Sequence, residues 1–323
     1  MTDAASTGGA ILVICAAGLA RFVPALGAIS AIRAFHRDAR IVLLTDAATS
    51  AFAATAPYAD DIWIDDTIET ESIGPLLALR RRLQAENFAR VYDLDATPHT
   101  QRLFWLMYGW YALPFKRAQI FWSGTIPGTA LSHADPQRGA MHLFDRWTAQ
   151  LKIAGIGAVL RPDLSWVARQ VQSFTVPFRM TEAFVLMAPA PGPGQPWPAD
   201  RYGELASLLM GEGQIPVIVG PDVPRDLVTT VLEFCPEAID LTGRATVSES
   251  VFLAWAATAA LGPDNGIMHL AAAAGCPTVV LYNGASDPTL VGQRGSRVRI
   301  LRRPTLVEIP PAEVLAALGL LRK

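Results

Sequence analysis

The residues best suited to chemistry form one short run in the C-terminal half, Asp264-Asn265-Gly266-Ile267-Met268-His269. This run lies between a predicted strand and a predicted helix. The first amide groups of a helix are free to bind an anion, and Asn265 and Gly266 allow the tight turn through which a diphosphate comes close. His269 lies in the first helical turn, within reach of an anionic group or a sugar hydroxyl. The same pattern also fits a plain helix cap, with Asp264 as the cap and His269 as a half-buried core residue.

A second candidate is the pair Asp93 and Asp95. Alternate residues of a strand point to the same face, so the two carboxylates could hold one Mg²⁺ or Mn²⁺. In the alternative interpretation Asp93 caps a strand end and Asp95 is an ordinary polar neighbour. We favour the alternative because this spacing is common by chance. We therefore expect neither a metal ion nor another cofactor.

Hydrophobic patterning predicts two similar scaffolds for these residues. Apolar runs followed by helical patterns predict strands at 11–14, 41–45, 62–64, 91–94, 183–188, 216–220, 239–241, 259–261 and 278–282. Alternating strands and helices indicate parallel sheets covered on both faces. The aromatic, glycine-rich segment 105–139 is expected to form loops around a cleft instead. Pro162 and Pro177 indicate a linker, so we predict an α/β protein with Rossmann-like domains at 1–175 and 176–323.

Composition excludes several classes of protein. The chain is 51% hydrophobic and 17% charged, with a formal net charge of -2, which argues against disorder and against a nucleic-acid partner. Its three scattered cysteines fit buried thiols, not a disulfide framework or a zinc site. No basic segment precedes the apolar run 10–20, and no apolar run reaches the ~18–20 residues of a membrane span. The first turn lacks the G-x-G-x-x-G pattern of dinucleotide oxidoreductases. We expect a cytoplasmic protein.

One resemblance covers most of the chain. The run 261–295, LGPDNGIMHLAAAAGCPTVVLYNGASDPTLVGQRG, resembles the signature of glycosyltransferase family 9, the bacterial heptosyltransferases. The similarity continues in chain order, and its further segments are 11–33, 122–124, 132–133, 141–155, 197–205 and 240–243. Because these segments are long and ordered, they indicate the family more specifically than a single motif does.

The resemblance implies a GT-B type architecture of two facing Rossmann-like domains. The donor, typically ADP-heptose, would bind the C-terminal domain. A lipid-linked or lipopolysaccharide-core acceptor would bind the N-terminal domain, with peripheral contact at the inner face of the cytoplasmic membrane. Transfer would be inverting and independent of metal, with a base that takes the acceptor hydroxyl proton and positive groups that hold the departing diphosphate. The donor-binding candidates are Asp264, Asn265, Gly266, His269, Gln195, Asp222 and Thr242. For Asp222 an ordinary loop acid is the favoured alternative.

The sequence departs from the family at positions that matter for chemistry. Ala20-Arg21 replaces the family's Gly-Asp, whose Asp is the presumed base, and an arginine cannot act as a base because its pKa lies above ~12. Gln195, or Pro196 with a slip of one residue, replaces a lysine that faces the donor phosphates. Two hypotheses follow. In the first, the chain is an enzyme in which Arg21 restores the lost charge and either Asp95 or His133 is the base. In the second, it is a catalytically impaired relative that binds a nucleotide sugar or a partner without transfer.

Overall fold

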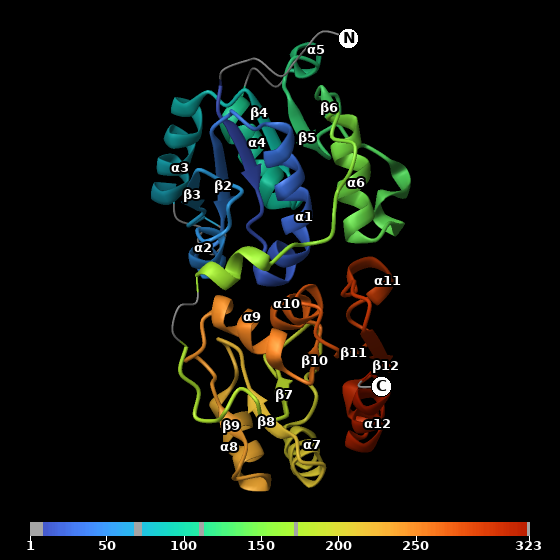
Figure 1. Ribbon diagram of the computed structural model, residues 1–323. Coiled ribbons are helices and arrows are strands. Elements are labelled where there is room, and N and C mark those ends of the chain that lie inside the picture. Colours follow the sequence, from blue (N-terminus) through green and yellow to red (C-terminus); the bar gives the residue numbers. More distant parts are fainter. Residues whose placement is uncertain (1–8, 68–72, 110–112, 171–173, 322–323) are drawn as a thin grey trace. The chain divides into compact units, whose positions relative to one another are not determined.

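The computed structural model describes residues 9–67, 73–109, 113–170 and 174–321. The chain divides into two compact units, Met1–Pro162 and Asp163–Lys323. Unit 1 is drawn from blue to green and unit 2 from yellow-green to red in Figure 1. The observed division lies 13 residues before the expected boundary at 175, at the first of the two prolines that indicated a linker.

Unit 1 contains a six-stranded parallel sheet with the order β3-β2-β1-β4-β5-β6. Its strands are β1 (Ile11–Ile14), β2 (Ile41–Thr45), β3 (Asp61–Ile64), β4 (Arg90–Asp93), β5 (Trp122–Gly124) and β6 (Leu131–Ser132). Its helices are α1 (Leu19–Phe35), α2 (Ala47–Ala53), α3 (Ile73–Glu86), α4 (Pro98–Tyr108), α5 (Pro114–Arg117), the 3-10 turn η2 (Pro136–Ala140) and α6 (Leu143–Ile153). The expectation that 105–139 is irregular is wrong, because this segment holds the end of α4, α5, β5 and β6.

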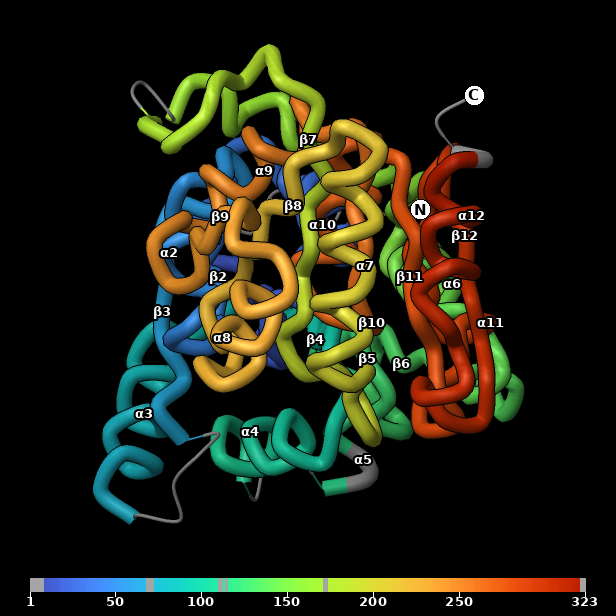
Figure 2. The backbone as a smooth tube through the Cα atoms, turned by 90° about the horizontal axis from the view of Figure 1, so that it is seen from below, coloured from blue at the N-terminus to red at the C-terminus, as the bar shows by residue number. Residues whose placement is uncertain are grey.

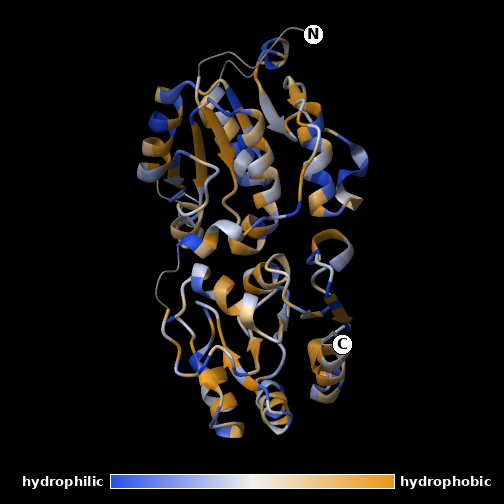
Figure 3. Cartoon of the chain, viewed as in Figure 1, coloured by the Kyte–Doolittle hydropathy of each residue, from blue (hydrophilic) through white to orange (hydrophobic). Residues whose placement is uncertain are grey.

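The core of unit 1 explains why these segments form strands. Every residue of β1 and β2 is buried, as a sheet covered by helices on both faces requires. The strands stand out as hydrophobic in Figure 3, whereas the helices are mixed. Helix α1 packs beside α6 in front of the sheet, and α4 packs beside α3 behind it (Figures 1 and 2).

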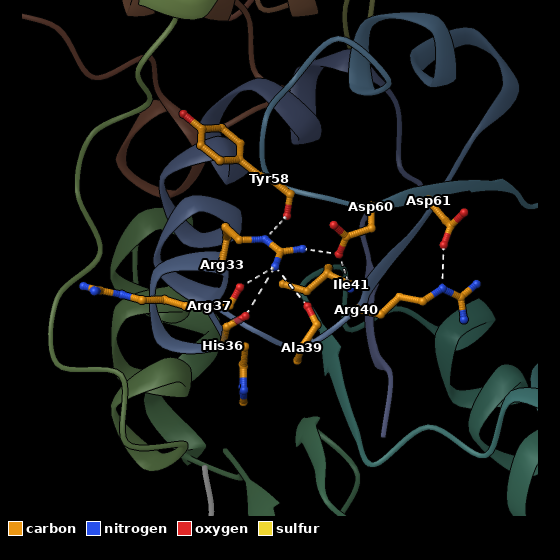
Figure 4. Close-up of polar contacts among 9 residues, drawn as sticks. All are labelled: Arg33, His36, Arg37, Ala39, Arg40, Ile41, Tyr58, Asp60 and Asp61. Carbon is orange, nitrogen blue, oxygen red and sulfur yellow. Dashed lines mark hydrogen bonds and ion pairs between the residues drawn. The ribbon is translucent and has the colours of Figure 1, made fainter. Parts of the chain in front are cut away.

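Arg33 holds the C-terminal end of α1 in place. Its guanidinium forms an ion pair with Asp60 and donates to the backbone carbonyls of Tyr58, His36, Arg37 and Ala39 (Figure 4). Asp60 also accepts the amide of Ile41 at 2.7 Å, at the start of β2. A cation at a helix C-terminus satisfies carbonyls that have no partner within the helix. These contacts fix the connection from α1 to β2, and so the direction of α1.

Unit 2 repeats the plan with a parallel sheet in the order β12-β11-β10-β7-β8-β9. Its strands are β7 (Phe184–Met187), β8 (Ile215–Ile218), β9 (Ile239–Asp240), β10 (Ala259–Pro263), β11 (Thr278–Tyr282) and β12 (Val298–Arg302). Its helices are η3 (Ser165–Arg169), α7 (Ala199–Gly211), α8 (Arg225–Phe234), α9 (Val247–Ala256), α10 (Gly266–Ala273), α11 (Pro288–Val291), η4 (Leu306–Glu308) and α12 (Pro311–Leu321). The predicted α/β class with two Rossmann-like domains is confirmed.

Trp197 anchors the start of α7 in this core. Its ring is 1% exposed, packs against Tyr202 and donates from Nε1 to the carbonyl of Ile309 at 3.0 Å. The Trp-Pro pattern therefore has a packing role. Within the described part of the chain, no helix is both long and apolar enough to cross a bilayer.

Candidate functional site

Asn265 builds the turn between β10 and α10 in unit 2. As the N-cap, its Oδ1 accepts the amide of Met268 at 3.1 Å. Its Nδ2 donates to the carbonyls of Ala188 and Ala190, at 2.9 and 3.1 Å, just after β7. All of these contacts are internal, so Asn265 positions the turn and leaves the first amides of α10, beginning at Gly266, for a ligand.

Asp264 is the centre of a hydrogen-bond network in the same turn. Its carboxylate accepts from Ser286 Oγ at 2.8 Å and Gln293 Nε2 at 2.9 Å, and His269 Nε2 lies 3.4 Å away. Burial opposes ionisation, but the hydrogen bonds from these side chains hold the pKa of Asp264 below its usual value. Asp264 is therefore an anion that orients His269. Through Ser286 and Gln293 it also holds the segment after β11 against the turn.

The loop that follows β7 lies directly against this turn. A side chain at Gly192 would come within 2.6 Å of the carbonyl oxygen of Asp264, so only glycine fits there. Asn283 Nδ2 donates to the carbonyls of Pro193 and Gln195 at 2.7 and 3.2 Å. The backbone of Gln195 is therefore fixed near Asp264, while its side chain is exposed.

The other two donor candidates follow the next strands along the sheet. Asp222 is exposed in the loop after β8. Thr242 follows β9, where its Oγ1 contacts Asp240 at 2.5 Å and Arg225 Nη1 at 3.0 Å. The amide of Gly243 donates to the carbonyl of Gly220 at 3.0 Å, which joins the two loops. All seven candidates thus lie at the carboxyl edge of one parallel sheet, where such folds bind ligands.

Asp95 lies at the carboxyl edge of the other sheet, in unit 1. It is 9% exposed, and its Oδ2 accepts the amide of Ala16, after β1, at 2.6 Å. Its Oδ1 is buried and has no hydrogen-bond partner among the described residues. Burial raises the pKa of Asp95 to about 7; the Ala16 amide and the charge of Arg21 oppose this, and the charges of Asp93 and Asp46 add to it. An unsatisfied buried carboxyl oxygen with a pKa near neutrality is typical of a functional group.

Asp93 has a different role. Its two oxygens accept the amide of Ala96 and the hydroxyl of Thr100, both at 2.8 Å, at the start of α4. Burial raises the pKa of Asp93 to about 6, although these hydrogen bonds oppose the shift. Strand β4 ends at Asp93, so Asp95 lies beyond the strand and outside its alternation. No group of three or more His, Cys, Asp or Glu in the described segments could hold a metal ion.

His133 is held by an arginine that the sequence analysis did not single out. Its Nδ1 contacts Nη1 of Arg138, and burial together with the Arg138 charge lowers the pKa of His133. Because a guanidinium only donates, Nδ1 must be the acceptor. The neutral ring then carries its proton on Nε2 and cannot take up another there. This geometry favours Asp95 over His133 as a base.

Arg21 and Arg146 also lie at the carboxyl edge of the unit 1 sheet, in the first turns of α1 and α6. Arg21 lies in the first turn of α1, is partly exposed, and makes no side-chain hydrogen bond within the described residues. Arg146 lies in the first turns of α6 and donates to the carbonyls of Met141 and Gly139 at 2.8 and 3.1 Å. A cation near a helix N-terminus opposes the helix dipole, and this was the one signal that could have identified both arginines from sequence.

Comparisons with solved structures agree with this architecture. The structure of E. coli ADP-heptose lps heptosyltransferase II is similar at a TM-score of 0.74 and 21% identity, over 97% of this chain and 98% of that one. A family 9 glycosyltransferase from Veillonella parvula gives 0.72 and 17%, over 97% of both chains. E. coli heptosyltransferase WaaC with ADP gives 0.70 and 14%, over 96% and 99%. At these identities the likeness establishes the fold.

Sequence comparisons identify the family. Lipooligosaccharide heptosyltransferase 2 of Haemophilus influenzae is 30% identical over 119 residues, which are 34% of this chain and 33% of that protein. Lipopolysaccharide heptosyltransferase 2 of E. coli K12 is 30% identical over 152 residues, or 40% and 43%. The match thus spans less than half of these curated relatives. The profile described as glycosyltransferase family 9 (heptosyltransferase) matches residues 150–312, half of the chain. The chain therefore belongs to glycosyltransferase family 9.

Proposed function

We propose that this protein is an inverting, metal-independent glycosyltransferase that moves a heptose from ADP-heptose to a lipopolysaccharide-type acceptor. The observation that carries the proposal is the turn Asp264–His269, whose side chains are hydrogen-bonded within the fold while the first amides of α10 have no partner in the helix. Relatives described as lipopolysaccharide heptosyltransferases, and a WaaC structure that holds ADP, support the choice of donor and acceptor.

In this proposal unit 1 supplies the base. Asp95 replaces the missing family carboxylate, because its Oδ1 has no partner in the described residues and its pKa is about 7. A base works best when its pKa lies near the working pH. Arg21 supplies positive charge in place of the family lysine for which Gln195 stands. His133 does not accept the proton in this proposal, because its Nδ1 already accepts a hydrogen bond from Arg138.

The competing proposal is a catalytically impaired relative that binds a nucleotide sugar or a partner without transfer. It is favoured by the pair of changes at Arg21 and Gln195, which remove the family's base and one donor cation. The two proposals differ in one respect. An enzyme needs a carboxylate that can become ionised in unit 1, whereas a binding protein needs only the turn of unit 2.

The test begins with donor binding by the full chain. ADP at ~100 times its dissociation constant should stabilise the fold by about 2.7 kcal/mol, measured as a rise in melting temperature without added metal. His269→Ala should reduce the rise, while Glu233→Ala, an exposed position on α8, serves as the control. If no nucleoside diphosphate shifts the melting temperature, the transferase and the nucleotide-sugar-binding relative are both wrong, and only binding of a partner is left. If ADP binds but ADP-heptose gives no product with a lipid A–Kdo acceptor, the impaired relative is favoured.

We also propose that unit 1 contacts an anionic membrane through α3, α4 and α5. These helices carry six basic residues, and their one acidic residue, Glu86, is already paired with Arg40: the basic residues are Arg80, Arg81, Arg82, Arg102, Lys116 and Arg117. Exposed apolar side chains lie on the same helices, with Ile73 71% and Trp105 48% exposed. A cavity of about 600 Å³ lies at the amino-terminal ends of β4 and β5. Its lining includes Arg80, Lys116, Phe88 and Ile120.

Vesicle binding tests this surface. Each basic residue near an anionic bilayer contributes about 1 kcal/mol. Replacing Arg80, Arg81 and Arg82 with Gln should therefore weaken the affinity for phosphatidylglycerol vesicles, measured by cosedimentation, by roughly a hundredfold. Matched replacement of Arg299, Arg302 and Arg303 in unit 2 should leave it unchanged. Equal binding to neutral phosphatidylcholine vesicles would contradict an electrostatic contact.

A further inference from the structure

Three arginines of unit 1 form no ion pair with a carboxylate, although the charges of Asp93 and Asp95 act on Arg138 and Arg21. They are Arg21 on α1, Arg138 on η2 and Arg146 on α6, and none forms an ion pair within the described residues. Two of them lie in the first turns of helices, where the helix dipole disfavours a cation. The Gly18 amide at the start of α1 donates to the Asp46 carboxylate at 3.1 Å, so this end already has one anionic partner. A further anion would stabilise the two arginines in these first turns.

Neutral acceptors hold two of the guanidinium groups in place. Arg138 donates to Oε1 of Gln150 at 3.1 Å and to the backbone carbonyl of Arg146 at 3.5 Å, in addition to its contact with His133. Gln150 in turn donates to the carbonyls of Asp93 and Ser123, at 2.8 and 3.1 Å. These partners fix the direction of Arg138 without cancelling its charge. A fixed cation loses little entropy when a ligand binds.

The three side chains share one edge of unit 1. Helices α1 and α6 lie side by side (Figure 1), and the ring of Phe35, at the end of α1, lies beside Gly155, just beyond the end of α6. Both helices follow a strand of this sheet and begin at its carboxyl edge, where Trp147 Nε1 donates to the carbonyl of Leu94 at 2.8 Å. Burial and the charge of Arg146 lower the pKa of Arg138, the charge of Asp93 opposes this, and the charge of Arg21 adds to the lowering. The arginines thus repel one another, and Asp93 offsets part of that repulsion.

We propose that Arg21, Arg138 and Arg146 form a binding site for a phosphate group at the carboxyl edge of the unit 1 sheet. Guanidinium groups bind phosphate oxygens through directed, charge-assisted hydrogen bonds. A phosphate dianion offers three oxygens and two charges to the three cations, whereas a carboxylate offers two oxygens and one charge. The phosphate belongs either to the diphosphate of a nucleotide sugar or to a phosphorylated acceptor. Binding of phosphate does not depend on the proposed transfer.

The test uses the full chain and inorganic phosphate, with chloride at equal ionic strength as the reference. Phosphate should raise the melting temperature of the wild type, and Arg21→Gln or Arg146→Gln should weaken its binding about tenfold. Arg37→Gln removes an exposed charge from the same unit and should change nothing. Without phosphate, Arg21→Gln should melt at a higher temperature than the wild type, because it relieves repulsion.

Arg21→Gln keeps the test decisive if Arg146→Gln fails to fold, since the Arg21 side chain makes no hydrogen bond within the described residues. The proposal is overturned if phosphate stabilises no more than chloride does, if acetate binds more tightly than phosphate, or if Arg37→Gln weakens phosphate as much as Arg21→Gln. Titration of ADP identifies the source of the group. Competition between ADP and phosphate assigns the site to the donor diphosphate, and independent binding assigns it to a phosphorylated acceptor. Both results support the site, and neither depends on turnover.

Discussion

The carboxyl edges of the two sheets use their carboxylates in opposite ways. In unit 2, Asp264 lies among three side-chain donors, and those hydrogen bonds hold its pKa below the usual value. In unit 1, Asp95 accepts one amide, leaves Oδ1 without a partner among the described residues, and has a pKa of about 7. A saturated carboxylate is suited to positioning other groups, and an unsatisfied one to exchanging a proton.

The cations of the two edges differ in the same way. Arg225 of unit 2 pairs with Asp240 at 2.8 Å, whereas Arg21 and Arg146 of unit 1 have no carboxylate partner in the described chain. Unit 2 thus pairs its arginine within the fold and leaves backbone amides for a ligand, whereas these arginines of unit 1 form no ion pair. We expect Asp264→Asn and Arg225→Gln in unit 2 to lower stability, and Asp95→Asn and Arg21→Gln in unit 1 to raise it.

The largest effect is expected on turnover by Asp95→Asn. Asparagine keeps the size of the side chain but cannot take a proton, so the transfer rate should fall by ~10²–10⁴ while ADP binding stays unchanged. Wild-type kcat/KM should rise with pH around a midpoint near 7, the pKa of Asp95. The control is His133→Gln, which should cost much less. If His133→Gln abolished turnover and Asp95→Asn did not, the base would have been assigned to the wrong residue.

The next largest effect concerns stability, also at Asp95. Its pKa is raised from 3.8 to about 7 in the folded protein. Below pH ~4 both the folded and the unfolded chain are protonated here, and between pH ~4 and ~7 only the folded chain keeps the proton. The free energy of unfolding therefore falls as pH rises through this window. Asp95→Asn removes that loss, so its advantage over the wild type should grow to at most ~4 kcal/mol by pH 8. Urea titrations at pH 4 and pH 8 measure it, and an advantage independent of pH would contradict it.

Asp264→Asn should change stability in the other direction. Charge-assisted hydrogen bonds to a buried carboxylate contribute about 1.5–3 kcal/mol, so the free energy of unfolding should fall by about that amount at pH 7. Ser286→Ala removes one neutral donor from the same network and should cost less, about 1 kcal/mol. If Asp264→Asn were as stable as the wild type, the contrast between the two edges would not hold.

The sequence predicted local features of these edges and could not predict their partners. The turn at Asp264 follows from an apolar strand, a capping residue and a helical pattern, all within a few positions of one another. Ser286 and Gln293, which complete it, lie 22 and 29 residues further along the chain, and no local pattern links them to Asp264. The raised pKa of Asp95 could not be predicted from the sequence either, because it depends on burial in the folded chain.

Three of the strands that were missed have weak periodicity. Strands β5 and β6 have three and two residues, too few for an alternation to show. The edge strand β12, with the sequence VRILR, exposes most of its residues and lacks a continuous apolar run. Arg138 and Arg146 resemble a solvated helix face in the sequence, and only the fold shows that they lie beside α1. Fully buried strands such as β1 and β10 were predictable because burial on both faces requires apolar residues throughout.

The smallest expected effect separates the arginines of the two units by sign. Arg225→Gln breaks an ion pair whose arginine is 67% exposed, so it should lower the free energy of unfolding by about 0.2–1 kcal/mol. Arg21→Gln, measured without phosphate, should raise it by a comparable amount, because we expect the repulsion of Arg21 from Arg138 and Arg146 to outweigh its attraction to Asp95. Both differences should shrink in ~1 M NaCl, where the Debye length is about 3 Å. Chemical denaturation of both variants and the wild type, in low and high salt, measures the signs directly. If Arg21→Gln were destabilising at low salt, the side chain would have a structural partner, and the unmatched charge at the edge of unit 1 would lose its main support.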